Sequence, residues 1–414
     1  MTMREGWGIT TGTCAAAAAK AAAMVLAGRP APLAVEIRLP GDVPVRESPR
    51  RSRGDSGGVT LRVPILFARQ TAAGAATAAV RKDAGQDADV THGMEVRVTV
   101  AWDAGDGVTL AAGEGVGTVT KPGLQVPPGE PAINPVPRQM IAAAVREVTA
   151  AGLRVEIAIP GGRLAAQKTF NPRLGIQGGL SVLGTTGIVR PYCTKALHDA
   201  LRCALRVAAA CGVTAPVLVP GNIGAKAARQ HFTLAEEQVI EAGNAWGFLL
   251  DEITRTPEVL PSPSGRGAGG EGACDGNWPI VANPIEIPLT PTLSRRERGT
   301  RPFRALLLAG HPGKLAKLAV GQWDTHSSRS AAATEYLGRV WAEVLDRPAP
   351  RVPTVEGMLK SLPADQRESL AAELARRVRK AVARRIEDRA GVAVLLVDMA
   401  GRRLGADGDF SPWG

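Results

Sequence analysis

Residues 304–321 read RALLLAGHPGKLAKLAVG: a short apolar run, a glycine-bearing turn, and a segment with the spacing of a helix. The same order recurs in VLVPGNIG (217–224) and QVIEAGN (238–244), and another apolar run occurs in VAVLLVDMAG (392–401). Strands made only of apolar residues are buried on both faces, which is typical of a parallel sheet covered by helices. We therefore expect residues 176–414 to form an α/β domain with parallel strands.

The turns that follow these strands predict a ligand site. In open parallel sheets, ligands bind at the edge formed by the carboxyl ends of the strands. The segment LSVLGTTGIVRP (180–191) is interpreted as a further strand of the same sheet, followed by its own turn. The residues expected to contact a ligand at this edge are Gly184, Thr185, Thr186, Gly187, Gly221, Asn222, Gly310 and Lys314.

The N-terminal part of the chain has a different pattern. Apolar and polar residues alternate, as in half-buried strands, in LAVEIRLP (33–40), VTLRVPI (59–65) and MEVRVTV (94–100). We expect an α+β domain over residues 1–175, with mixed or antiparallel strands. The whole chain is thus predicted to be α/β with two domains.

A glycine- and threonine-rich turn, WGITTGTC (7–14), leads into an alanine-rich helix that ends at Gly28. Thr10, Thr11 and Thr13 are suited to cap the first amides of this helix. A helix N-terminus can bind an anion. The alternative is a helix of small residues packed tightly on a sheet, and the sequence leaves both open.

Two further segments carry polar or glycine-rich patterns. The loop VRKDAGQDADVTHG (80–93) suits a metal or acid–base chemistry, but loops also simply collect polar residues. It holds Lys82, Asp83, Asp87, Asp89 and His92. Gly113, Gly115 and Gly117 would let the backbone approach a phosphate or carboxylate, although a tight hairpin explains them equally well.

Composition limits the class of protein. The 414 residues are 45% hydrophobic, which excludes a wholly disordered chain. No run of 18 apolar residues and no secretory leader pattern occurs, so a cytoplasmic location is expected. The five cysteines show neither a CxxC pair nor zinc spacing, which argues against a disulfide framework or a structural metal site. The net charge of +11 suits nucleic acid, anionic lipid or a polyanionic small molecule. With 4% aromatic residues, base stacking is disfavoured.

Residues 256–303 interrupt the α/β pattern. Pro and Gly make up 15 of these 48 residues, and no hydrophobic period survives. This composition predicts a disordered surface insertion, with a functional lid as the alternative. Its five basic and five acidic residues cancel, so the insertion does not explain the net positive charge.

Several long motifs, in order, resemble those of the CbiD family, the cobalt-precorrin-5B C1-methyltransferases of anaerobic cobalamin biosynthesis. The resemblance covers nearly the whole chain outside 46–58 and 256–303. The motifs are TTGTCAAAAAKAA (10–22), RKDAGQDADVTHG (81–93), GEGVGTVTKPG (113–123), PAINPVPR (131–138), KTFNPRLGIQGGLSVLGTTGIVRP (168–191), VLVPGN (217–222) and GHPGKLAKLAVGQWDTHS (310–327).

This resemblance implies a reaction and its partners. The methyl donor would be S-adenosylmethionine, and the acceptor a carboxylate-rich corrinoid converted to cobalt-precorrin-6A with loss of a two-carbon fragment. Cobalt enters only as part of the substrate, and no protein metal site is expected. Other enzymes of the cobalamin pathway and a second copy of the chain are the expected protein partners. Nucleic acid and membranes are not expected.

With the resemblance, the candidate residues acquire roles. The eight turn residues named above, from Gly184 to Lys314, are expected to bind the donor. Asp83, His92 and His311 are the titratable candidates for a base or a water-positioning group. A carboxylate-rich acceptor suits arginine forks and helix N-termini in a cleft between the domains. Its expected contacts are Thr11, Thr13, Lys121, Arg138, Arg173 and Arg190.

Three rival interpretations stay open from the sequence. One is a methyltransferase that acts on another tetrapyrrole. Another is a corrinoid-binding scaffold or carrier of the same fold without turnover. The third, a nucleic-acid-binding protein, rests on the charge alone, and the low aromatic content argues against it.

Overall fold

The computed structural model describes residues 6–40, 59–71, 74–191, 194–255, 302–326 and 330–414. The chain divides into two compact units between residues 193 and 194, and each unit is described here by itself. The predicted insertion lies outside the described residues except for Pro302 and Phe303. Phe303 is buried in the core of the second unit. The predicted insertion 256–303 therefore extends too far at its C-terminal end.

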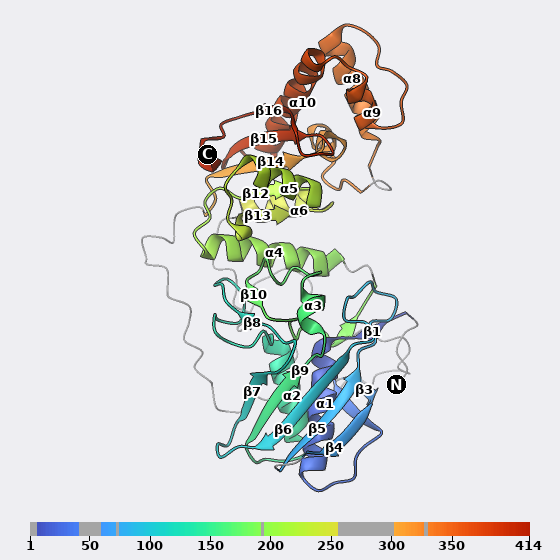
Figure 1. The fold of residues 1–414 in the computed structure, drawn as a ribbon, viewed down its shortest axis with the longest axis vertical. Helices are drawn as coiled ribbons and strands as arrows, with labels where there is room; N and C mark the ends of the chain where they lie inside the picture. The colour runs from blue at the N-terminus through green and yellow to red at the C-terminus, as the bar shows by residue number, and fades with distance from the viewer. Residues whose placement is uncertain (1–5, 41–58, 72–73, 192–193, 256–301, 327–329) are drawn as a thin grey trace, which may run out of the picture. The chain divides into compact units, whose positions relative to one another are not determined.

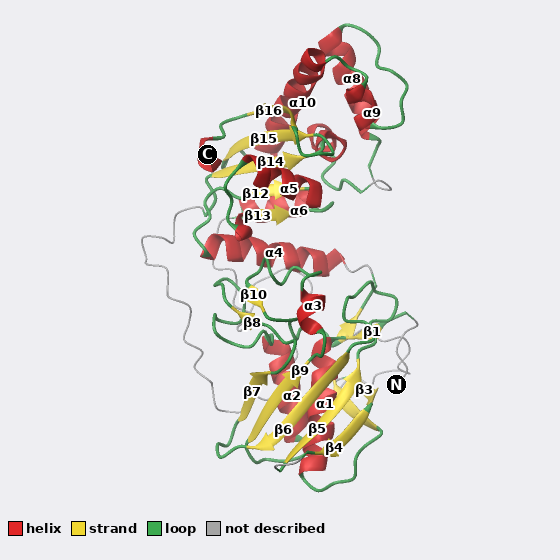
Figure 2. Cartoon of the chain, in the orientation of Figure 1, coloured by secondary structure: helices red, strands yellow, loops and turns green. Residues whose placement is uncertain are grey.

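The N-terminal unit is an α+β structure with a mixed sheet (Figures 1 and 2). The main sheet has the order β4-β5-β6-β9-β7, in which only the pair β7 and β9 is parallel. This confirms the prediction of mixed strands. The elements are β1 (Gly8–Ile9), α1 (Thr11–Leu26), β2 (Ala34–Arg38), β3 (Thr60–Pro64), β4 (Phe67–Gln70), β5 (Ala75–Arg81), β6 (Glu95–Trp102), β7 (Val108–Ala112), β8 (Thr118–Val119), α2 (Pro135–Arg146), β9 (Leu153–Ala158), α3 (Gly162–Ala166), β10 (Ile176–Gln177) and β11 (Ile188–Val189).

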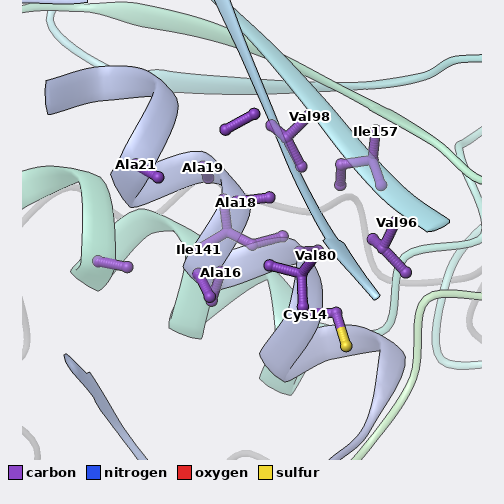
Figure 3. Packing of buried hydrophobic residues seen from close by; sticks show 14 of the residues in the cluster. Cys14, Ala16, Ala18, Ala19, Ala21, Val80, Val96, Val98, Ile141 and Ile157 are labelled. Atoms are coloured by element: carbon purple, nitrogen blue, oxygen red, sulfur yellow. The ribbon is translucent and has the colours of Figure 1, made fainter. Parts of the chain in front are cut away.

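Helix α1 lies at the centre of this unit's core. Figure 3 shows its alanines beside Val80 and Val98 of the sheet and Ile141 of α2. The segment 15–19 is fully buried alanine, and such small side chains let neighbours approach the helix on several sides. The helix therefore forms from residues with the highest helix propensity, and tertiary packing then holds it. This is the small-residue alternative left open by the sequence.

The C-terminal unit is a parallel sheet with helices, as predicted. The order is β13-β12-β14-β15-β16, in which only β16 runs antiparallel. The elements are α4 (Thr194–Ala210), β12 (Val217–Val219), α5 (Asn222–His231), η1 (Glu236–Gln238), β13 (Val239–Glu241), α6 (Trp246–Thr254), β14 (Ala305–Gly310), α7 (Pro312–Leu315), η3 (Ala316–Val320), α8 (Ala333–Leu345), α9 (Val355–Lys360), α10 (Ala364–Arg385), β15 (Gly391–Val397), β16 (Arg403–Asp407) and η4 (Ser411–Trp413).

Alternate residues of the central strands pack into two different cores. In β14, Leu306 and Leu308 join one hydrophobic cluster, whereas Leu307 and Ala309 join another. Both faces of the sheet are therefore buried, which is why these strands are apolar without interruption. None of the described helices is both long enough and apolar enough to cross a membrane.

The segment LSVLGTTGIVRP does not belong to the C-terminal sheet, so that expectation is corrected. Its strand β11 pairs with β1, and the preceding β10 pairs with β8. Both partners lie in the N-terminal unit, and the chain therefore leaves that unit after residue 193 rather than after 175. Strands of two residues are too short to reveal their partners through periodicity.

The close packing of α1 predicts that this unit does not tolerate a larger side chain in the alanine segment. We expect Ala18→Leu to lower the free energy of unfolding by about 1–3 kcal/mol, because overpacking forces neighbours from their rotamers. Ala364→Leu is the matched control, since Ala364 is an exposed alanine at the start of α10. Urea unfolding of both variants tests this. Equal stability of Ala18→Leu and the wild type would contradict the packing described for α1.

Candidate functional site

The carboxyl edge of the C-terminal sheet presents turns from three neighbouring strands. Gly221 follows β12 and has an extended backbone (φ 161°) on which a Cβ would meet no described atom within 4 Å. The helix α5 that follows packs directly against β14, since a Cβ on Gly224 would lie 2.5 Å from the Ala309 carbonyl oxygen. Gly221 and Asn222 therefore leave open space at the sheet edge, although the helix α5 that follows is packed tightly on β14.

A hydrogen-bonded bridge joins the segments after β14 and β13, the strands that flank β12. Lys314 Nζ donates to Asn244 Oδ1 at 2.8 Å. The Thr325 amide donates to the backbone carbonyl oxygen of Asn244 at 3.2 Å. Lys317, one turn after Lys314, is 7% exposed and donates to the Thr325 carbonyl oxygen (3.4 Å) and Ser330 Oγ (2.6 Å). The structure thus brings Gly310, Lys314, Gly221 and Asn222 to one edge, as predicted.

His311 lies at the same edge, but its ring is fixed by two hydrogen bonds. Its Nδ1 accepts from the Gly313 amide at 3.0 Å, so the neutral ring carries its proton on Nε2 and donates it to Glu356 Oε2, also at 3.0 Å. Although burial opposes the effect, hydrogen bonds from His311 and Lys360 lower the pKa of the Glu356 carboxyl. Neither ring nitrogen is left to accept a substrate proton. In the free protein His311 therefore caps α7, and its role as a base stays a prediction.

The polar loop after β5 is organised by a buried ion pair. Lys82 is 1% exposed and donates from Nζ to Asp89 Oδ2 at 3.0 Å. The other carboxylate oxygen of Asp89 accepts from the amide and the hydroxyl of Thr91. Although burial opposes the effect, these hydrogen bonds and the Lys82 charge hold the pKa of Asp89 below its ordinary value. The pair fixes the loop between residues 82 and 93.

This loop brings two of the predicted catalytic residues together at the surface. His92 Nδ1 lies 3.9 Å from Asp83 Oδ1, and both side chains are more than half exposed. The His92 Nδ1 accepts from the Ala84 amide at 3.1 Å, so the neutral ring presents Nε2–H as a donor. Asp83 Oδ1 accepts from the Gly85 amide at 2.8 Å. The third candidate, His311, belongs to the other unit.

The turn 184–187 lies over the start of α1 in the N-terminal unit. Thr10 donates its amide to the Gly187 carbonyl at 3.0 Å, and Gly12 donates to the Leu183 carbonyl at 3.1 Å. Gly184 and Gly187 have positive φ, and a Cβ on Gly184 would lie 2.4 Å from Thr10 Oγ1. This corrects the expected place of Gly184, Thr185, Thr186 and Gly187, which belong to the N-terminal unit.

Thr11 and Thr13, expected to touch the acceptor, are buried and bonded within the protein. The Thr11 hydroxyl donates to the Leu183 carbonyl, and its oxygen accepts from the Leu183 amide. The Thr13 hydroxyl donates to the Gly187 carbonyl at 2.7 Å. The amides of Gly12 and Thr13 are also taken by protein acceptors. These contacts fix the turn to the helix, and a contact of the threonines with the acceptor stays a prediction.

The basic candidates of the N-terminal unit differ in their surroundings. Arg138 donates to the Ile133 and Pro131 carbonyls at 2.7 and 3.1 Å, which ties its guanidinium to the backbone before α2. The Arg190 guanidinium lies over the Trp7 ring at 4.8 Å. Lys121 and Arg173 are partly buried and flank Gly175, on which a Cβ would meet the Lys121 side chain at 2.4 Å. These bonds make Arg138 a weaker candidate than the other three.

Two other features of the sequence have structural explanations. The glycines at 113–117 permit close backbone approach, since a Cβ on Gly115 would lie 2.0 Å from the Ile159 carbonyl oxygen. Burial raises the pKa of the Cys14 thiol to about 12, which keeps it neutral and unreactive. Within the described ranges, no group of three His, Cys, Asp or Glu side chains is arranged to hold a metal ion.

Some residues of this site were not among the sequence candidates. Asn244 lies in a glycine-bearing turn and Lys317 in a motif, so both had a weak signal. The hydrogen bond from Lys314 to Asn244 spans residues 70 positions apart and needs the tertiary fold. Glu356, the partner of His311, lies on α9 and had no sequence signal at all.

The sequence of this chain matches the models of a known family. The CbiD model matches residues 2–191, and the model of the CbiD C-terminal domain matches residues 324–408. A crystal structure of a cobalamin biosynthesis protein (cbiD) from Archaeoglobus fulgidus covers 80% of this chain and 84% of that chain, at 24% identity and a TM-score of 0.34.

Two curated relatives carry the name cobalt-precorrin-5B C(1)-methyltransferase. The one from Syntrophotalea carbinolica is 45% identical and covers 98% of each chain. The one from Ralstonia nicotianae is 36% identical, over 97% of this chain and 93% of the relative. With the family models, these similarities show that the chain belongs to the CbiD family.

The buried ion pair predicts how the polar loop responds to mutation. Lys82→Met leaves the Asp89 carboxylate without its cation, and we expect a loss of about 3 kcal/mol in the free energy of unfolding at pH 7. Lys82→Met/Asp89→Asn should recover part of it, because no partly buried charge then remains. The folded-state pKa of Asp89 is depressed, so its contribution is complete above the unfolded pKa of about 3.9.

That contribution is lost as the pH falls through the folded-state value. The gap between the wild type and Lys82→Met should therefore narrow below about pH 4. Urea unfolding at several pH values measures it. A gap that is constant from pH 7 to pH 3, or a double variant less stable than Lys82→Met, would refute the ion-pair account.

Proposed function

We propose that this chain transfers the methyl group of S-adenosylmethionine to C1 of cobalt-precorrin-5B, giving cobalt-precorrin-6A. Membership of the CbiD family carries this proposal, because the similarity to relatives named for C1 methylation extends over nearly the whole chain. The polar, glycine-bearing edge of the C-terminal sheet supplies a suitable place for a small donor. No observation favours the scaffold interpretation over an enzyme.

The chemistry asks the protein mainly for alignment. The macrocycle carbon attacks the methyl carbon, the bond from that carbon to sulfur breaks, and its electron pair stays on sulfur to give S-adenosylhomocysteine. Sulfonium is already an excellent leaving group, so neither a protein nucleophile nor a metal is required. Holding donor and acceptor in line can supply roughly 7–11 kcal/mol. We therefore expect residues that position the donor and the acceptor, rather than residues that activate a nucleophile.

The proposed donor site is the carboxyl edge of the C-terminal sheet. Gly221 offers a backbone without a side chain, and Gly310 adjoins it closely enough that a Cβ there would lie 2.6 Å from Pro220 Cδ. Asn222 and the bridge from Lys314 to Asn244 add hydrogen-bonding groups at the same edge. The turn 184–187 is left out of this donor site because it packs on α1.

The acceptor is proposed to engage basic groups of the N-terminal unit. Lys121, Arg173 and Arg190 are the candidates, because charge-assisted bonds to carboxylates are stronger than neutral ones. Asp83 is the proposed base or water-positioning group for the step that releases the two-carbon fragment, with His92 beside it as a donor. A site between the two domains stays a prediction.

A labelled-methyl assay tests the function directly. Full-length protein is incubated with S-adenosylmethionine carrying a labelled methyl group and with cobalt-precorrin-5B. We expect the label on the macrocycle at C1 and one S-adenosylhomocysteine for each methyl group transferred. Binding of both ligands without transfer would replace the enzyme by the scaffold interpretation, and a label at another ring position would contradict C1 specificity.

A pair of glycine variants connects this assay to the proposed donor site. Gly221→Val puts a side chain into open space on extended backbone, so it should fold normally and weaken S-adenosylmethionine binding about tenfold or more. Gly105→Val is the control, since a Cβ there also meets no described atom within 4 Å. Calorimetric titration measures the affinity. Unchanged affinity in folded Gly221→Val would remove the donor from this edge.

A further inference from the structure

The two lysines after β14 are held by neutral acceptors. Lys314 Nζ donates to the Asn244 amide oxygen, and Lys317 Nζ donates to a carbonyl and a hydroxyl. Among the described residues, no carboxylate oxygen lies within 4.0 Å of either ammonium group. The two side chains are one helical turn apart and carry two positive charges at the edge of the sheet.

Lys82 shows what a buried lysine ordinarily has in this protein. Lys82 is 1% exposed and Lys317 is 7% exposed, so both side chains are largely covered by the protein. Lys82 has the Asp89 carboxylate at 3.0 Å, as buried charges generally require. Lys317 has no such partner in the described part of the chain. Burial, and secondarily the nearby charge of Lys314, lowers the pKa of Lys317.

An uncompensated buried ammonium costs stability unless something neutralises it. A hydroxyl and a carbonyl satisfy its hydrogen bonds but not its charge. A hydrophobic side chain of similar length would fit the same buried position without this cost. An anion arriving at the sheet edge would supply the missing negative charge.

We propose that Lys314 and Lys317 form the carboxylate-binding part of the ligand site at this edge. The inference rests on the proposed function for the identity of its ligands. Within that function two molecules supply a carboxylate: the aminocarboxypropyl group of S-adenosylmethionine and the periphery of the corrinoid. Asn244 positions Lys314 through its hydrogen bond, and Ser330 and Thr325 position Lys317.

The test compares ligands with and without the carboxylate in full-length variants. The probes are S-adenosylmethionine and its decarboxylated analogue, and cobyrinic acid and the amidated corrinoid cobinamide. Lys314→Met and Lys317→Met remove one charge each. Lys380→Met, on the exposed face of α10, is the matched control. Calorimetric titration gives the affinities, and thermal unfolding reports on the fold.

We expect each variant to lose about 10- to 150-fold in affinity for one carboxylate ligand. Binding of its carboxylate-free counterpart should change less than twofold, which identifies the source of the carboxylate. The unfolding temperature of Lys317→Met should equal or exceed that of the wild type, because a buried unpaired charge is gone. A purely structural lysine would instead lower it. Lys314 is less buried than Lys317, so Lys314→Met tests the affinity of the same site for carboxylates without removing a buried charge.

Normal affinity for both carboxylate ligands in folded variants overturns the proposal. An equal loss for ligands with and without the carboxylate also overturns it, because the lysines would then only shape the site. Wild-type protein that binds neither carboxylate probe overturns it as well. If methyl transfer fails while the lysine variants show the carboxylate-dependent loss, only the proposed function falls. If transfer proceeds and the variants bind normally, only this inference falls.

Discussion

Burial of both faces of the C-terminal sheet is the constraint on which the candidate site depends. The side chains of strands β12, β14 and β15 are divided between two hydrophobic cores. These strands therefore contain no polar side chain that could bind a ligand. Next to these three strands, polar side chains and unshielded glycine backbone occur in the turns at the strand ends. Because the strands are parallel, the turns at their carboxyl ends meet at one edge. Gly221, Asn244 and Lys314 come together for this reason.

Much of the fold could be predicted from local pattern. The uninterrupted apolar runs identified the parallel sheet, and the alternating runs identified the mixed sheet of the N-terminal unit. The turn 184–187 was assigned to the wrong unit because its strands are two residues long and pair with β1 and β8. The glycines of that turn have their own physical reason: positive φ and contact with Thr10 and Thr13. A glycine-bearing turn alone does not distinguish an open ligand site from a close backbone approach.

The site could be predicted only in part, because residue type does not determine bonding. His311 is a catalytic candidate by residue type, but only the structure shows that both of its ring nitrogens are hydrogen-bonded in the free protein. Thr11 and Thr13 have hydroxyls suited to a ligand, but those hydroxyls bond to the 183–187 turn. Conversely, Lys82 and Lys317 are both lysines within motifs, and only the structure shows that one has a carboxylate partner and the other has neutral ones.

Hydrogen exchange of the full-length chain, with and without S-adenosylmethionine, tests most directly whether the donor binds at the C-terminal sheet edge. The account predicts slower amide exchange on donor addition at residues 219–224, 241–246 and 309–317, which form that edge. Exchange at residues 10–14 and 183–187 should stay unchanged, because their hydrogen bonds are already made in the free protein. Protection confined to 10–14 and 183–187 would contradict the account and move the donor to the N-terminal unit.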